Sequence, residues 1–273
     1  MGKYLYWSNR RIRVVAEDYD IALDRRWLRS YSFTLPMLLH IQLGERESTV
    51  RKRAEVAARI ERRLVASAGL DAPRPLAFAR GTGRVSFARF EGTYAANDGA
   101  LMHCRAHDAA GRRIDVCLFG SMEHLRPFRG ADAYQTEWVS SEAPAIEQLL
   151  KHRGVPPEPW GEDAEYLSVE ALKIMLHQGM TPYAREHPEQ PWARGSALGH
   201  AGECDWFAEI YTDVVLDADR WQFIDDLQGT ERILIGAPLW VRTADPAAVV
   251  RYGRLRTAAR RRRPRPPVLD RRR

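Results

Sequence analysis

The alternation of apolar and polar positions predicts a strand at each end of the folded part of the chain. In residues 3–7 the tyrosines Tyr4 and Tyr6 fall on one face, and Leu5 and Trp7 fall on the other. Residues 232–241 form an apolar, β-branched run that predicts the final strand, with a kink at its proline. A third strand is expected at 32–43, at a sheet edge because it also contains a proline.

Apolar residues at helical spacing predict a helix over 48–68, capped by Ser48 or Thr49 and ended by Gly69. Its polar side is rich in arginine and glutamate, and such a run is more often a solvated surface than a binding surface. The charged residues of this side are Arg51, Lys52, Glu55, Arg59, Glu61, Arg62 and Arg63.

Further helices are expected at 144–152 and 163–178, the second ended by a glycine. A stiff segment rich in proline and glycine lies between them and makes 153–162 a possible internal boundary. Residues 180–202 have the composition of a long loop. Residues 204–216 fit both a helix and a strand, and their apolar spacing favours the helix.

Between residues 75 and 119 the apolar period changes to two, which predicts an antiparallel meander of two hairpins. The first hairpin would turn at the Gly-Thr-Gly of 81–83, and the second would turn at 108–112. In the second hairpin Ile114, Val116 and Leu118 should share one face.

These elements predict an α+β fold, with a mixed and mainly antiparallel sheet packed against helices. The first and last strands are expected to be neighbours. Residues 1–250 would form a single domain, and 251–273 would form a disordered basic tail.

Charge separates this tail from the rest of the chain. Residues 251–273 hold eleven arginines and one carboxylate, so the remainder has 31 basic and 35 acidic residues although the whole chain is +6. A nucleic-acid-binding domain should carry clustered basic residues on its own folded surface, which a mildly acidic body does not suggest. The tail arginines are the polyanion-binding candidates, through weak and nonspecific contacts with nucleic acid: Arg260, Arg261, Arg262, Arg263 and Arg265.

The remaining composition indicates a soluble cytoplasmic protein. Of the 273 residues 45% are apolar, yet no run is long enough to cross a membrane and no signal peptide opens the chain, so no membrane partner is expected. The odd number and wide spacing of the three cysteines fit neither a disulfide framework nor a paired zinc site. We therefore expect buried, reduced thiols.

A family resemblance rests on two segments, Tyr-Leu-Tyr-Trp-Ser at 4–8 and Ile-Leu-Ile-Gly-Ala-Pro-Leu-Trp-Val at 233–241. Together with 116–121 and 171–174, they resemble an uncharacterised actinobacterial family of unknown function. The resemblance supplies no catalytic residues. Related families lie in bacterial regulatory or self-defence gene clusters, so by analogy it implies a sensing or partner-binding role, with another protein of the same system as partner.

The cluster of His103, Cys104 and His107 has the residue types of a zinc site. On a strand, however, the two histidines point to one face and the cysteine to the other, so the three side chains do not converge. We therefore predict no metal site here. The chain also lacks GxSxG, GxGxxG and GxxxxGK[ST] motifs, and no cofactor is expected.

A catalytic hypothesis rests on His177, His200 and Cys204, because a thiol near a helix N-terminus and an imidazole can form a nucleophilic pair. Capping of that helix by Glu203 or Asp205 is the favoured alternative for this segment.

A ligand-binding hypothesis rests on Ser121, Glu123 and His124, which follow a buried strand at a corner where backbone amides can meet a ligand. With no convergent catalytic motif, the leading prediction is a non-enzymatic sensing or interaction module of a bacterial regulatory or defence system. The alternatives are an enzyme with a His/Cys site, and docking of polyanions through the tail.

Overall fold

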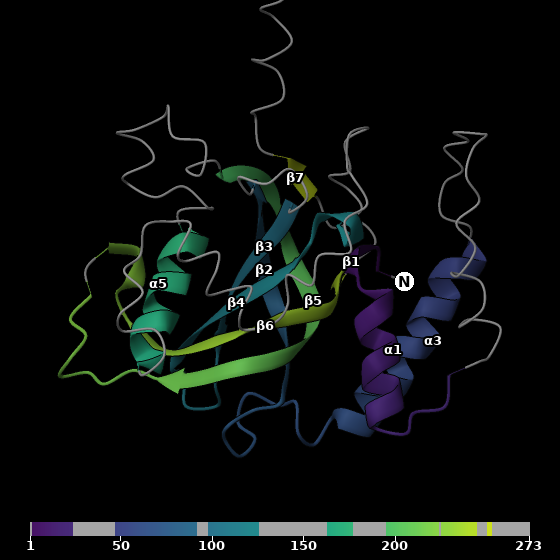
Figure 1. Ribbon diagram of the computed structural model, residues 1–273, viewed down its shortest axis with the longest axis horizontal. Helices are drawn as coiled ribbons and strands as arrows, with labels where there is room; N and C mark the ends of the chain where they lie inside the picture. The colour runs from purple at the N-terminus through teal and green to yellow at the C-terminus, as the bar shows by residue number, and fades with distance from the viewer. Residues whose placement is uncertain are drawn as a thin grey trace, which may run out of the picture.

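The structure is a computed structural model with three α-helices and seven strands in the part of the chain that it describes (Figure 1). The described residues are 2–23, 47–91, 98–125, 163–176, 195–223, 225–244 and 250–252.

Seven strands form one sheet in the order β1-β6-β4-β3-β2-β5-β7. Because β6 pairs with β5 as well as with β4, the five strands β2 to β6 close into a barrel. Only the β4–β6 pairing is parallel among these strands. The strands are β1 (Tyr4–Trp7), β2 (Phe78–Glu91), β3 (Asp98–His107), β4 (Arg113–Ser121), β5 (Gly195–Val215), β6 (Thr230–Thr243) and β7 (Val250–Tyr252).

The barrel interior holds a contiguous cluster of buried apolar side chains contributed by all five barrel strands, which we call the barrel core. Alternate residues of each strand point inward, as the period of a strand requires. The inward set includes Val85, Phe87, Met102, Cys104, Ile114, Val116, Leu118, Cys204, Trp206, Ile210, Leu234 and Val241.

Helices pack against parts of the outer face of the barrel. On one side α5 (Ala164–Leu176) buries Val169 and Leu172 against outward residues such as Ile233. On the other side α1 (Asn9–Asp18) and α3 (Glu47–Leu64) bury their apolar stripes against an aromatic cluster that includes Trp240. Figure 1 shows α5 at one end of the barrel and α1 beside α3 at the other.

Several predictions from sequence are confirmed. The helix expected at 48–68 is α3, the helix expected at 163–178 includes α5, and the hairpin at 108–112 joins β3 to β4. The opening strand pairs with the predicted closing strand, β6. The mixed, mainly antiparallel sheet is present, but it closes into a barrel, which the sequence did not suggest.

The first predicted hairpin is wrong, because β2 runs through residues 81–83 without a turn. Gly81 has a packing role instead: a Cβ at this position would lie 2.6 Å from the indole ring of Trp206 in the barrel core. The register of β2 with β5 shifts just after Gly83, which marks a β-bulge. Gly81 and Gly83 therefore lie next to this bulge in a curved strand.

The helix predicted at 204–216 is also wrong, since residues 204–215 belong to β5, which begins at Gly195 inside the predicted loop. Inward Trp206 and Ile210 alternate with outward Phe207 and Glu209, a period of two. Pairing with β2 on one edge and β6 on the other overrides the local helical spacing.

Strict alternation in the opening strand is interrupted. Register with β6 shifts between Tyr4 and Tyr6, so Leu5 and Tyr6 both join the barrel core, while Tyr4 and Trp7 pack toward α1 and α3. A bulge of this kind places two neighbouring residues on one side.

Some predictions lie outside the described residues: the strand at 32–43, the helix at 144–152 and the boundary at 153–162. At the end of the chain β7 pairs with β5 and includes Arg251 and Tyr252, two residues past the expected domain end. The rest of the predicted tail also lies outside the described residues. Within the described ranges, no helix has the length and apolarity needed to cross a bilayer.

The contact at Gly81 gives a stability test. Gly81→Ala should lower the free energy of unfolding by about 1–3 kcal/mol, because the new methyl group meets a buried indole ring that has little room to move. Gly202→Ala is the matched control, since its Cβ would meet nothing within 4 Å. Chemical denaturation measures both, and equal effects would contradict the packing role.

Candidate functional site

A seam in the barrel wall forms where β4 and β6 separate. Their parallel pairing ends at Leu118 and Gly236, after which β6 pairs with β1 through Trp7. On its other side β1 is bridged from Tyr6 to Leu125. The opening strand therefore fills the gap between the end of β4 and the second half of β6.

Tyr6 is the central side chain of this seam. It is 2% exposed, and its hydroxyl oxygen accepts a hydrogen bond of 3.3 Å from the backbone N–H of Ser121. The residue before Ser121 is Gly120, and it must be a glycine because a Cβ there would lie 2.5 Å from the hydroxyl oxygen of Tyr6. Burial raises the pKa of Tyr6 more than its hydrogen bonds and the charge of Arg11 lower it, so the phenol stays neutral.

The predicted ligand-binding residues lie together beside Tyr6. The Ser121 hydroxyl accepts a 3.3 Å hydrogen bond from the N–H of Glu123 and caps the short helix η1 (Met122–His124). Nε2 of His124 lies 3.1 Å from Oε1 of Glu123, and its ring meets the Tyr6 ring edge-on at 5.7 Å. We call Tyr6, Ser121, Glu123 and His124 the seam site.

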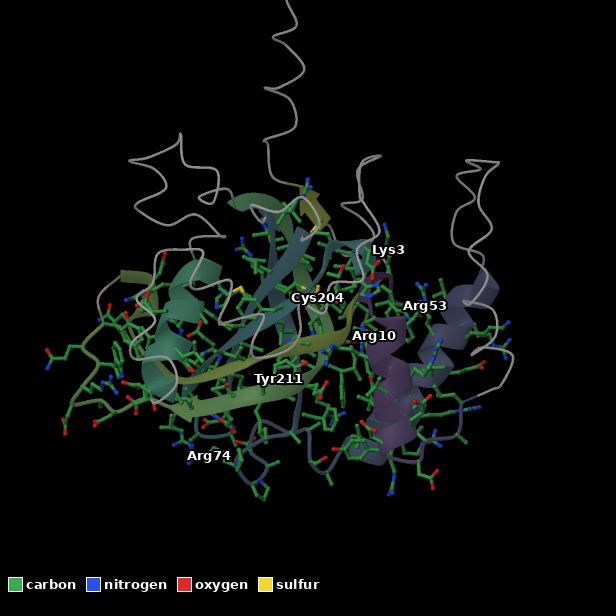
Figure 2. The ribbon with its side chains drawn as sticks, viewed as in Figure 1. Lys3, Arg10, Arg53, Arg74, Cys204 and Tyr211 are labelled. Carbon is green, nitrogen blue, oxygen red and sulfur yellow. The ribbon has the colours of Figure 1, made fainter. Side chains whose placement is uncertain are left out.

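The first turn of α1 borders the seam site. Ser8 caps this helix by accepting a hydrogen bond from the N–H of Arg11. The guanidinium of Arg11 forms an ion pair with Glu209 and lies over the ring of Tyr211, 5.5 Å from its centroid. Figure 2 marks Tyr211 on β5, in front of the barrel.

The seam site combines a rigid base with accessible polar groups. Tyr6 and Ser121 are buried, whereas the side chains of Glu123 and His124 are 29% and 20% exposed. Such an arrangement presents hydrogen-bond donors and acceptors at fixed positions, which suits recognition of a polar ligand. Sequence reasoning found three of its members but missed Tyr6, which only the long-range pairing of β1 brings there.

The predicted catalytic residues do not form a reactive pair in the described structure. Cys204 points into the barrel core, and burial raises the pKa of its thiol to about 12. His200 precedes the inward Ala201 and therefore lies on the opposite face of β5. His177 lies outside the described residues.

Helix capping by Glu203 or Asp205 is wrong, because no helix starts there. Glu203 has a positive φ of 47° where β5 changes register with β2, and its carbonyl accepts a hydrogen bond from the N–H of Ala244. Asp205 instead pairs with Arg242 across the strands at 3.2 Å.

The expectation that His103 and Cys104 diverge is confirmed. Cys104 lies in the barrel core, where burial raises its pKa to about 12, while Nε2 of His103 lies 2.8 Å from the carboxylate of Asp115. Across the described ranges, no group of three or more His, Cys, Asp or Glu residues is placed to hold a metal ion.

Sequence reasoning missed the buried carboxylate of Asp115 on β4. Besides His103 it contacts Nε of Arg113 at 2.8 Å and accepts a 2.9 Å hydrogen bond from the hydroxyl of Thr230. Burial alone would raise the pKa of Asp115, but the hydrogen bonds and positive charge of His103 and Arg113 outweigh it and lower the pKa. This network ties β3, β4 and β6 together. The sequence signal that could have revealed this network is a single acidic residue within an otherwise apolar predicted strand.

A scan against protein-family models finds no match for this chain, and searches of curated proteins and of solved structures find none either. The resemblance to the actinobacterial family stays a prediction.

The buried thiols predict slow alkylation. In the folded protein at neutral pH, Cys104, Cys117 and Cys204 should all resist iodoacetamide, because burial keeps them protonated as well as inaccessible. After unfolding all three should react, as mass spectrometry would show. Rapid labelling of Cys204 in the folded state would revive the nucleophile hypothesis.

Asp115 predicts a pH-dependent contribution to stability. Its pKa is lowered by folding, so the stabilisation is present above its ordinary value of 3.8 and is lost as the pH falls through the lower folded value. Asp115→Asn should lower the free energy of unfolding at neutral pH by about 3–5 kcal/mol, since it breaks a buried ion pair.

Urea denaturation across a pH series measures this effect. The difference between Asp115→Asn and the unmodified protein should shrink in acid. Asp226→Asn is the control, because that carboxylate is 81% exposed and should have little effect. A difference that is the same at every pH would contradict the role of the charge.

Proposed function

We propose that this chain is a non-enzymatic sensing or interaction module of a bacterial regulatory or defence system, acting in the cytoplasm, and that its ligand contacts the seam site. The observation that carries the proposal is the seam site itself. Tyr6 of β1 and Ser121 at the end of β4, far apart in the sequence, form a buried base, and the side chains of Glu123 and His124 beside it are accessible.

The rest of the barrel supports a role in binding. Its interior holds buried apolar side chains, so polar recognition takes place on the outer surface. Its thiols are buried, with their pKa values raised, which opposes nucleophilic chemistry. In the seam site the Ser121 hydroxyl already accepts the N–H of Glu123, a structural role at the start of η1.

Native mass spectrometry of the full chain, purified from its own host under mild conditions, tests this proposal. We expect a bound small molecule or partner protein on the unmodified chain, and its loss in His124→Ala and Glu123→Gln, which alter the accessible polar groups of the seam site. His107→Ala is the matched control, because His107 is exposed at the far end of β3. Retention of the bound species in His124→Ala, or its loss in His107→Ala, would contradict the assignment of the site.

A further inference from the structure

Helix α3 has two chemically distinct faces. Its apolar face is buried against the aromatic cluster of the barrel wall through Val56, Ala57, Ile60 and Leu64. Its opposite face is exposed and carries five cations, which we call the α3 basic face: Arg51, Lys52, Arg59, Arg62 and Arg63.

Acidic side chains offset little of this charge. Glu55 pairs with Arg51 at 3.2 Å, and Glu61 turns away to contact Arg242 at 3.2 Å. Arg59 and Arg63 are four residues apart and are neighbours of like charge on the helix surface, a destabilising arrangement of a few tenths of a kcal/mol. With five cations against the single exposed carboxylate of Glu55 among the described side chains of α3, the face keeps an excess of positive charge, which suits a partner of opposite charge.

Further cations lie close to α1 and α3. Arg10, in the first turn of α1, and Lys3 are exposed, and no acidic residue occupies that turn. Arg53 of α3 lies over the ring of Trp7, 5.4 Å from its centroid, and so joins α3 to the start of α1. Figure 2 shows Lys3, Arg10 and Arg53 on the side of the molecule that α1 and α3 occupy.

We propose that the α3 basic face is a docking surface for double-stranded nucleic acid. Lys52 and Arg63 are separated by about 16 Å along the helix axis, at a rise of about 1.5 Å per residue. A DNA duplex carries one negative charge per about 1.7 Å of its length, and its major groove of about 12 Å admits a helix. The small, exposed Ala58 lies within the basic face and allows close approach.

A membrane surface fits this face less well. Interfacial helices bury an apolar face in the lipid, but the apolar face of α3 is already occupied by the barrel. Outside residues 251–273 the chain has slightly more acidic than basic residues. This net charge does not show where the charges lie on the surface, so it is compatible with a basic face on α3. This surface is a second binding face, independent of the seam site.

Fluorescence anisotropy with a labelled DNA duplex over a salt series tests the proposal in the full chain. The ten arginines of 254–273 are replaced by glutamine in every variant, so that binding through the tail does not mask the helix. We expect this protein to bind duplex. Arg62→Gln with Arg63→Gln should weaken binding at low salt and reduce the salt slope by about 2, about 1 per lost phosphate contact.

Arg74→Gln with Arg84→Gln is the matched control, because these exposed arginines lie outside α3 and their loss changes the net charge equally. The control should keep the slope and affinity. Arg62 and Arg63 lie in the last turn of α3, where cations interact favourably with the helix dipole, so unfolding midpoints are measured to verify that the double variant is folded in the binding assay. His124→Ala should leave duplex binding unchanged, which separates this proposal from the seam site.

Three outcomes would overturn the proposal: no duplex binding before α3 is altered, equal weakening in the Arg74 and Arg84 control, or an unchanged slope in the α3 variant. Vesicles containing phosphatidylserine serve as a second probe. Binding to these vesicles that depends on Arg62 and Arg63, without binding to duplex, would assign the basic face to a lipid surface instead.

Discussion

Closure of the barrel through β6 is the constraint on which the rest of the structure depends. This strand pairs in parallel with β4 and antiparallel with β5, and it has no free edge along the paired region. Closure gives the inward residues of five strands a common interior, which is why the barrel core is contiguous. It also creates the seam, since β6 must leave β4 to follow β5, and β1 fills the space.

Buried polar networks hold this closure in register. Arg232 of β6 binds the carboxylate of Asp213 on β5 through two hydrogen bonds of 2.7 Å, and it also donates to the carbonyl of Leu70. The network around Asp115 joins β3, β4 and β6 in the same way. A slip of either strand would leave a buried charge without its partner, a large cost that an apolar contact does not impose.

Because the barrel interior is filled with apolar side chains, both proposed binding surfaces lie on the outside of the molecule. The seam site and the α3 basic face differ in the interactions that they offer a ligand. The seam site is a small set of hydrogen-bonding groups fixed by strand pairing, and the α3 basic face is a long array of charge displayed by a helix whose other face is buried. The first suits a specific polar ligand, whereas the second suits an extended polyanion. The barrel thus positions both surfaces, and Tyr6 links the seam site to the barrel core.

The sequence by itself determined the elements whose signals are local: α3, from its apolar spacing, and the β3–β4 hairpin, from its turn and alternation. It also determined the neighbouring positions of β1 and β6. Only the tertiary structure decided that β5 is a strand, that Gly81 makes room for Trp206, and that Tyr6 meets Ser121. These features depend on contacts between residues far apart in the chain, and barrel closure selects them over local preference because pairing and burial outweigh intrinsic propensity.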